Sequence, residues 1–356
     1  MTIVYILAAI LIFGMLIAVH ELGHFLAAKA SGVQVNEFSI GMGPEVWSRT
    51  AGETQYSLRL LPIGGFCAME GEEEASDSPR ALNRQGFWKK LLIFAAGALM
   101  NLLMGFVILL ILYSGTEHYL IPQISGVAPE FEARYGDVLQ QGDVFYAING
   151  QRVYIYGDVE LLLGLKSGEP LDLTVLRDGK KVVLQDLVWD TYTGPDGQSQ
   201  YKGYGLYRTA EVAEATVLQK LRLSWLNTVD FARIVGLSLQ MLVNGDAGLE
   251  DVGGPVMIVS TITEVGQSSE TAREAVDNIL YFAALIAVNL AVMNLLSIPA
   301  LDGGHIAFLI LNTVSDKLFG RHIPDRYETA VSGACFALLM GFMLFITFYD
   351  VFRLIR

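Results

Sequence analysis

Four long apolar stretches divide the chain, and each approaches the roughly 20 residues that a helix needs to cross a bilayer. The first begins at Met1 and runs without a charge to Val19; the others are Leu91–Tyr113, Ile279–Ile298 and Ala334–Tyr349. Apolar runs of this length are typical of transmembrane helices. The pattern therefore predicts a polytopic α-helical membrane protein with four transmembrane helices.

The stretch between the second and third spans has a different pattern. Phe145–Val153 predicts two short strands joined at Asn149-Gly150, which is a strong hairpin signal. Leu171–Val183 alternates apolar and polar residues, as a half-buried strand pair would. We therefore expect an inserted soluble α+β domain.

Two further segments carry many apolar residues but are not expected to span. Val33–Met69 is rich in strand formers and glycine, which predicts a membrane-associated β-hairpin region. That region either pairs with an extended ligand or only braces the helices. Thr216–Val243 is apolar enough to be counted as a span, but Lys220, Arg222 and Arg233 favour an amphipathic helix in the membrane interface.

These patterns divide the chain into eight segments. They are a first transmembrane helix (1–30), a cytoplasmic β-rich loop (31–90), a second helix (91–115), the soluble domain (116–210), an interfacial helix with a connecting segment (211–278), a third helix (279–305), a cytoplasmic loop (306–332) and a fourth helix (333–356).

Composition agrees with a membrane protein: 53% of the residues are hydrophobic and only 17% are charged. The net charge of −13 and the absence of a basic patch with interleaved aromatics exclude nucleic acid as a partner. Cys67 and Cys335 lie far apart, so neither a disulfide framework nor a cysteine zinc site is expected.

Positive charges predict the orientation of the chain in the membrane. Segment 31–90 carries seven of them near the spans if Lys29 at its border is counted, whereas none precedes the first helix. The positive-inside rule puts this loop in the cytoplasm, and the N-terminus, the inserted domain and the C-terminus outside. The first segment lacks a basic start and a small-residue cleavage site, so we expect a retained helix rather than a signal peptide.

The first span contains the chain's most informative motif, HELGH at residues 20–24. His20 and His24 stand at i and i+4 on one helix face, where both imidazoles can bind one Zn²⁺. Glu21 beside them can take a proton from a zinc-bound water. The alternative is that the motif only ends the helix at the membrane surface, where polar residues cost little.

A catalytic zinc needs a third protein ligand, and Asp302 is the candidate. Pro299 and the glycines after Asp302 predict an irregular segment at the end of the third span. Helices one and three run in the same direction, so both motifs arrive at the same membrane face, near the cytoplasm. An ordinary loop aspartate is the alternative.

These motifs resemble the site-2 protease family of intramembrane zinc metalloproteases, specifically its RseP-type bacterial members with a single PDZ domain. The resemblance covers nearly the whole chain, through HELGH, FSIGMGPEVW, LPIGGFCAMEGE, FAAGALMN and NLAVMNLLSIPALDGGH in that order. It implies that His20, His24 and Asp302 bind zinc and that Glu21 is the catalytic acid/base. Two positions depart from the family pattern: Ser297 and Ala98 stand where it has proline.

The resemblance also implies a substrate class. Asn289 and Asn294 match paired asparagines that hold the substrate backbone near the metal in this family. The substrates would be single-span membrane proteins of the anti-sigma-factor type, already cut outside, and signal-peptide remnants are a second class. The PDZ domain would exclude uncut ectodomains, although no glycine–hydrophobic carboxylate loop stands out in it.

Two other classes of protein compete with this prediction. A metal transporter would need polar residues along a path through the spans, and the second and fourth spans offer almost none. A catalytically silent PDZ scaffold would have no use for Glu21 beside two histidines. His305 could support the metal site from outside or could only pack, and the oligomeric state is not indicated.

Overall fold

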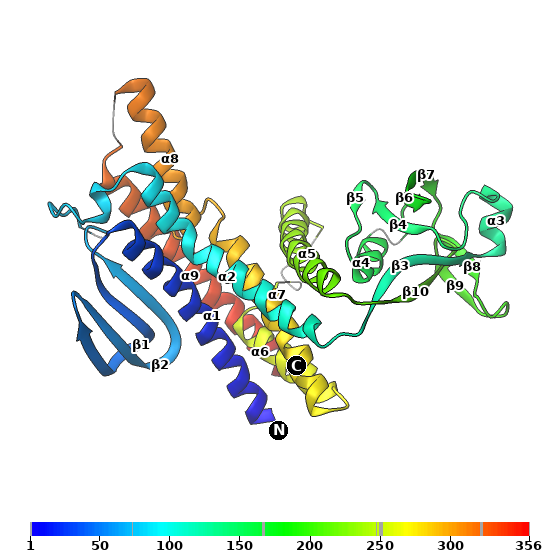
Figure 1. Cartoon of the computed structure of the whole chain (residues 1–356), viewed down its shortest axis with the longest axis horizontal. Helices are drawn as coiled ribbons and strands as arrows, with labels where there is room; N and C mark the ends of the chain where they lie inside the picture. Colours follow the sequence, from blue (N-terminus) through cyan, green and yellow to red (C-terminus); the bar gives the residue numbers. More distant parts are fainter. Residues whose placement is uncertain are drawn as a thin grey trace. The chain divides into compact units, whose positions relative to one another are not determined.

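The chain forms two compact units in a computed structural model that describes residues 2–355 except 73, 166–167, 247, 249–251 and 321–322. One unit combines residues 1–109 with 231–356, and the other is residues 110–230. The first is mainly helical and the second mainly β (Figure 1). The chain is therefore a helical unit into which a β-rich unit is inserted.

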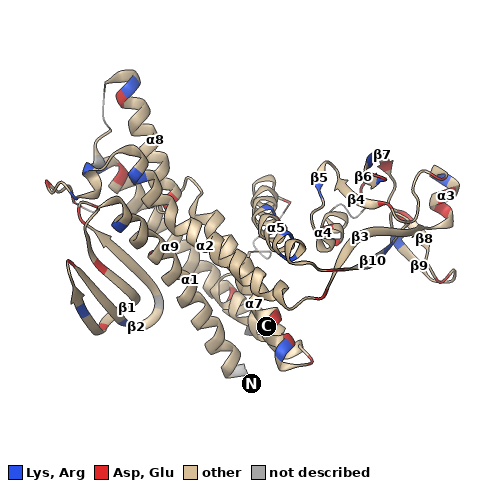
Figure 2. Cartoon of the chain, viewed as in Figure 1, with Lys and Arg blue, Asp and Glu red and all other residues tan. Residues whose placement is uncertain are grey.

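Five helices of the described chain are long and apolar enough to cross a membrane. They are α1 (Thr2–Ser31), α2 (Phe87–Ser114), α5 (Val217–Asn244), α7 (Ala272–Asn294) and α9 (Asp325–Ile355). Residues 2–20 of α1, 91–114 of α2 and 329–349 of α9 contain no Lys, Arg, Asp or Glu, as a bilayer requires, and Figure 2 shows α1 and α2 largely without charged residues. The structure thus agrees with a multi-pass membrane protein carrying an inserted β domain.

Two further helices lie in segments for which the sequence analysis named no such helix. α8 (Asp302–Phe319) replaces much of the expected cytoplasmic loop at 306–332, and α6 (Pro255–Ser268) lies within the connecting segment 211–278. Gly303 and Gly304 have low helix propensity, so the sequence gives little indication that a helix begins here. Its end is nevertheless marked by Gly320 in the left-handed conformation, with φ +61°.

The core of the helical unit joins the two ends of the chain. Ala9 and Leu16 of α1, Ile262 of α6 and Ala287 of α7 are fully buried together in one cluster. Hydrogen bonds also link α9 to α6: Asp350 Oδ2 accepts hydrogen bonds from the backbone N–H groups of Gly254 (3.0 Å) and Met257 (3.1 Å). These are orphan donors at the start of α6, so Asp350 caps that helix from a neighbouring one.

The segment after α1 forms a folded-over β-hairpin from β1 (Val35–Ala51) and β2 (Thr54–Met69), as expected. The start of β1 lies between two parts of β2, because Phe38 pairs with Cys67 on one side and with Tyr56 on the other. A short 3₁₀ helix (Leu82–Arg84) then leads to α2.

The turn of this hairpin is tied to the end of α1. Glu53 accepts hydrogen bonds from Lys29 (2.7 Å) and Arg80 (2.8 Å). The hydrogen bonds from Arg80 and then from Lys29 hold the pKa of Glu53 at about 2. β2 also contacts α1 deep in the apolar span, where a Cβ on Gly14 would lie 2.5 Å from the Pro62 carbonyl oxygen. The hairpin therefore lies against the membrane-spanning part of α1.

The β-rich unit contains a sheet with strand order β10-β3-β4-β6-β7, with β5 paired to β4. Both predicted turns are present, with Asn149 at φ 47° and Asp178 at φ 50°. The strands are β3 (His118–Val127), β4 (Val144–Ile148), β5 (Gln151–Arg152), β6 (Leu171–Arg177), β7 (Lys180–Leu187) and β10 (Leu206–Glu214). Helices α3 (Pro129–Tyr135) and α4 (Tyr156–Gly164) and a small hairpin of β8 (Asp190–Thr193) and β9 (Gln200–Gly203) complete the unit.

Asp350→Ala should loosen α6, because two backbone donors at its start lose their acceptor. We expect the protein to lose about 1–2 kcal/mol of stability, which thermal unfolding in detergent would measure. Asp277→Asn on the exposed face of α7 is the matched control and should leave the unfolding temperature unchanged. Equal unfolding temperatures for Asp350→Ala and the wild type would contradict the capping role.

The Asp143–Arg177 pair should make the β-rich unit sensitive to acid. Burial raises the pKa of Asp143, but the paired hydrogen bonds from Arg177 (2.7 and 2.6 Å) outweigh it and lower the pKa. A lowered pKa contributes stability above the ordinary value of about 3.9, and this stability is lost as the pH falls through the folded-state pKa.

Arg177→Leu should therefore reduce amide-exchange protection of β4 and β6 at pH 7, and the difference from wild type should shrink below about pH 4. Hydrogen–deuterium exchange of the full-length protein measures both. Arg134→Leu is the control, because its partner Asp190 is 52% exposed and the pair should contribute little. If the difference in amide-exchange protection between the wild type and Arg177→Leu instead grows toward low pH, the ionised Asp143–Arg177 pair is not what stabilises the two strands.

Candidate metal centre

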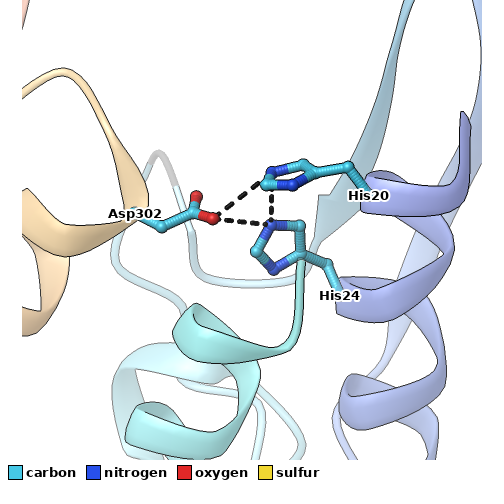
Figure 3. A group of neighbouring side chains, drawn as sticks. All are labelled: His20, His24 and Asp302. Carbon is cyan, nitrogen blue, oxygen red and sulfur yellow. Dashed lines mark hydrogen bonds and ion pairs between the residues drawn. The ribbon is translucent and has the colours of Figure 1, made fainter. Parts of the chain in front are cut away.

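The two histidines of HELGH lie on one face of α1, inside the membrane-spanning helix. His20 is 9% exposed and His24 is 8% exposed. Their Nε2 atoms lie 3.2 Å apart, and both rings point away from the α1 axis toward the same place (Figure 3). The i, i+4 spacing produces this convergence without any distortion of the helix.

Asp302 reaches the same place from the other end of the chain. Its Oδ2 lies 3.3 Å from His20 Nε2 and 3.4 Å from His24 Nε2 (Figure 3). Asp302 is the first residue of α8, after an irregular link that follows α7. A Cβ on Gly303 would lie 2.3 Å from the Leu296 carbonyl oxygen, so this link folds back tightly only because glycine follows Asp302.

The spacing of these three atoms fits a tetrahedral zinc ion. Zinc binds histidine nitrogen and carboxylate oxygen at about 2.0–2.2 Å, which places neighbouring ligand atoms roughly 3.3–3.5 Å apart. The observed separations are 3.2, 3.3 and 3.4 Å. In addition, Asp302 Oδ2 is buried and accepts no hydrogen bond within the described chain. Three such atoms form the donor set that a metal requires when both histidines carry their proton on Nδ1.

One stripe of α2 lines the other side of the histidines. Ile93, Gly97 and Asn101 recur every four residues, so they share one face of the helix. The Ile93 carbonyl oxygen lies 2.8 Å from His24 Nδ1, and Asn101 Nδ2 lies 3.3 Å from His20 Nδ1. A Cβ on Gly97 would come within 2.4 Å of His24 Nε2, so only glycine permits α2 to approach this closely.

Glu21 lies between the histidines and the β-hairpin. Its side chain is partly buried, and a Cβ on Gly65 of β2 would lie 3.3 Å from its Cγ. The carboxyl group therefore stands beside the strand that passes the metal centre. This is the position that a proton acceptor needs if an extended chain lies along that strand.

The remaining predicted residues are less closely tied to this centre. Asn294 is the last residue of α7 and Asn289 is exposed on the same helix; neither side chain has a hydrogen-bond partner within the described chain. His305 does not join the three converging atoms. Its Nδ1 lies 3.0 Å from Glu328 Oε1 and its ring stacks on Phe94 at 5.3 Å.

Sequence reasoning missed the contribution of α2. Asn101 is a polar residue in an otherwise apolar span, and nothing in a sequence says which neighbour such a residue faces. The signal was the spacing of Ile93, Gly97 and Asn101 at one helix face. The predicted residues His20, His24 and Asp302 are brought together, and α2 completes their surroundings.

A second candidate site lies within the β-rich unit. A pocket of about 230 Å³ opens between α4 and the strands β9 and β10. Its lining includes Leu163, Trp189, Tyr204, Leu206 and Arg208. The run Gly203-Tyr204-Gly205-Leu206 leads into β10 at its edge, and Gly205 has φ +71°. This glycine–hydrophobic run is the feature that sequence analysis did not single out.

A helical membrane unit with a buried HExxH motif and a converging aspartate defines a metallopeptidase whose site lies within the spans. The profile of peptidase family M50 matches residues 8–348. The chain therefore belongs to peptidase family M50, the site-2 proteases, and it is a zinc metalloprotease.

Several relatives match over almost their whole length. The chain is 36% identical over 355 residues to the "Putative zinc metalloprotease CPE1693" of Clostridium perfringens, covering 98% of both proteins. It is 35% identical over 349 residues to a protein of the same description in Clostridium acetobutylicum, covering 97% of each. It is 26% identical over 437 residues to the "Regulator of sigma-W protease RasP" of Bacillus subtilis, covering 98% of both.

Gly97→Ala should disturb the metal centre directly, because the added methyl group would overlap both imidazoles. We expect zinc affinity to fall by at least about tenfold, the range found when groups around ligating histidines are changed. Zinc competition against a chelator in detergent measures this. Gly341→Ala on α9, where a Cβ meets nothing within 4 Å, is the matched control. Wild-type zinc affinity in Gly97→Ala would contradict the contact.

Proposed function

We propose that this protein hydrolyses peptide bonds within the transmembrane segments of its substrates, with His20, His24 and Asp302 binding zinc and Glu21 as the catalytic acid/base. The observation that carries the proposal is the convergence of three buried ligand atoms, 3.2–3.4 Å apart, on one side of a membrane-spanning helix. Glu21 occupies the next position along α1, as the proton acceptor of an HExxH site does.

In the proposed reaction the metal and the protein have different roles: zinc would activate the carbonyl and the water, and Glu21 transfers the proton. Bound zinc would supply a Lewis acid that polarises the scissile carbonyl and lowers the pKa of a water to roughly 7. Glu21 takes the proton of the attacking water and returns it to the leaving amine. The bundle excludes bulk water from this place, which strengthens each electrostatic interaction within it.

The hairpin offers a way to hold a substrate that has lost its helical hydrogen bonds. A peptide bond inside a transmembrane helix is shielded, so the substrate has to unwind before hydrolysis, which exposes its backbone polar groups. The outer part of β2, Gly65–Met69, pairs with β1 on one side and has no second strand partner within the described chain. An extended substrate could add to this edge, while Asn289 and Asn294 offer further donors and acceptors.

The name of the Bacillus subtilis relative supports a substrate class. That protein is called a regulator of a sigma factor, and its chain matches this one end to end. We infer that this protein also acts on single-span membrane proteins of the anti-sigma-factor type after an outside cut. Signal-peptide remnants share the same chemistry, a lone apolar helix with little outside the membrane.

The proposed topology has four transmembrane helices, with α5 in the membrane interface. Were α5 a fifth span, α1 and α7 would run in opposite directions, and Asp302 would lie at the face opposite the histidines. The contact between Asp302 and both histidines supports the four-span arrangement. In that arrangement the N-terminus, the inserted domain and the C-terminus are extracytoplasmic, and the site is near the cytoplasmic face.

We assign the β-rich unit as a PDZ domain that screens substrates by the size of their outside part. Two features support this assignment. The sheet has five main strands, with α4 beside its edge strand β10, and the glycine-containing run Gly203–Leu206 directly precedes and enters that strand. A folded ectodomain would be held away from the membrane, whereas a short stub could pass.

The test is cleavage of a truncated single-span anti-sigma-type substrate by purified wild-type protein and by Glu21→Gln, with bound zinc measured in both. We expect equal zinc and product from the wild type alone, because the substitution removes the proton acceptor and leaves all three ligands. A loss of at least about 10²-fold in rate is expected. Glu264→Gln, at an exposed position of α6, should behave as the wild type.

The outcomes separate the parts of the proposal. Cleavage by Glu21→Gln at the wild-type rate would remove Glu21 from the chemistry. No zinc in a folded wild-type protein would overturn the ligand assignment. Zinc without cleavage of the truncated substrate would overturn the anti-sigma-type class, and a signal-peptide remnant assayed in parallel would then test the second class.

A further inference from the structure

The two histidines of the metal centre are held at their Nδ1 atoms in different ways. His24 Nδ1 lies 2.8 Å from the Ile93 carbonyl oxygen. A carbonyl oxygen only accepts, so His24 carries its proton on Nδ1 and presents a lone pair at Nε2. This is the tautomer that a metal needs, and the backbone of α2 selects it.

The Nδ1 atom of His20 faces the side chain of Asn101, where that of His24 faces a backbone carbonyl oxygen. Asn101 lies on the same stripe of α2, two helical turns after Ile93, and is only 1% exposed. A carboxamide can either donate from its nitrogen or accept at its oxygen. The orientation of this one amide therefore decides which nitrogen of His20 carries the proton.

The two orientations differ in what they leave unsatisfied. With Nδ2 toward His20, at 3.3 Å, Asn101 Oδ1 is buried and has no hydrogen-bond partner. The proton of a neutral His20 would then sit on Nε2, at the point where the ligand atoms converge. Turning the amide by 180° places Oδ1 against the Nδ1–H of His20, which satisfies the oxygen and frees the Nε2 lone pair.

We propose that Asn101 is a positioning residue for the metal centre: its carboxamide oxygen accepts the Nδ1 proton of His20 and so holds the Nε2 lone pair toward zinc. The inference rests on the proposed function, because it takes His20 as a zinc ligand. Ile93 and Asn101 then have the same role for the two histidines. The backbone carbonyl oxygen of Ile93 accepts the Nδ1 proton of His24, and the side-chain oxygen of Asn101 accepts that of His20. Groups of this kind fix the tautomer and the ring orientation of ligating histidines.

Asn101→Leu and Asn101→Asp test the acceptor directly. Leucine has nearly the shape of asparagine but accepts no hydrogen bond, whereas aspartate keeps an oxygen at the same place. Zinc affinity, measured by competition with a chelator in detergent, should fall about 10- to 100-fold in Asn101→Leu and by less than about threefold in Asn101→Asp. Leu103→Ala, at a lipid-exposed position of α2, is the control and should match the wild type.

Two further readouts separate positioning from packing. Excess zinc should restore much of the cleavage activity of Asn101→Leu, since the chemistry itself does not use Asn101. The thermal unfolding of the zinc-free protein should be similar in Asn101→Leu and the wild type, because leucine keeps the shape of asparagine, whereas a packing role would predict a loss of stability there. If Asn101→Leu does not fold, the pair Asn101→Ala and Asn101→Asp differs by the same acceptor and gives the same comparison.

The results that would overturn the inference are distinct from failure of the proposed function. Wild-type zinc affinity in Asn101→Leu would exclude the positioning role. Equal loss in Asn101→Leu and Asn101→Asp would show that the acceptor is not what matters. A wild-type protein that binds no zinc would instead overturn the metal site as a whole, before any variant is compared.

Discussion

The structure depends on three acceptor atoms that face one another within a membrane-spanning bundle. When both histidines present an Nε2 lone pair, these lone pairs and the carboxylate oxygen repel each other at this spacing unless a cation lies between them. Several neighbouring elements allow these three side chains to come together. Gly97 lets α2 approach, the link before Asp302 folds back on glycine, and β2 lies beside Glu21.

The neighbouring elements each solve a hydrogen-bonding problem that the membrane creates. Backbone groups that water would otherwise satisfy must find partners within the protein. Asp350 supplies an acceptor for the start of α6, and the Nδ1 atom of His24 finds an acceptor in the Ile93 carbonyl oxygen. The outer part of β2 has no second strand partner within the described residues, and it lies beside Glu21, where we propose that a substrate backbone adds to this edge.

The sequence allowed much of this arrangement to be predicted. The i, i+4 spacing of His20 and His24 is a property of any helix, and the same direction expected for the first and third spans predicted that Asp302 lies at the same membrane face as the histidines. The turns at Asn149 and Asp178 were predictable because those residues tolerate positive φ. By contrast, α8 was not predicted, because Pro299 and the two glycines after Asp302 were interpreted as an irregular segment, and the contact of Asn101 with His20 was missed because the two residues are distant in the chain.

The order in which the ligands are synthesised has a consequence for the cell. His20 and His24 belong to α1, whereas Asp302 is synthesised only after the whole β-rich unit. N-terminal parts of a chain fold first during synthesis. We therefore expect the proposed donor set to be incomplete, and the nascent protein to be inactive, until Asp302 has been synthesised.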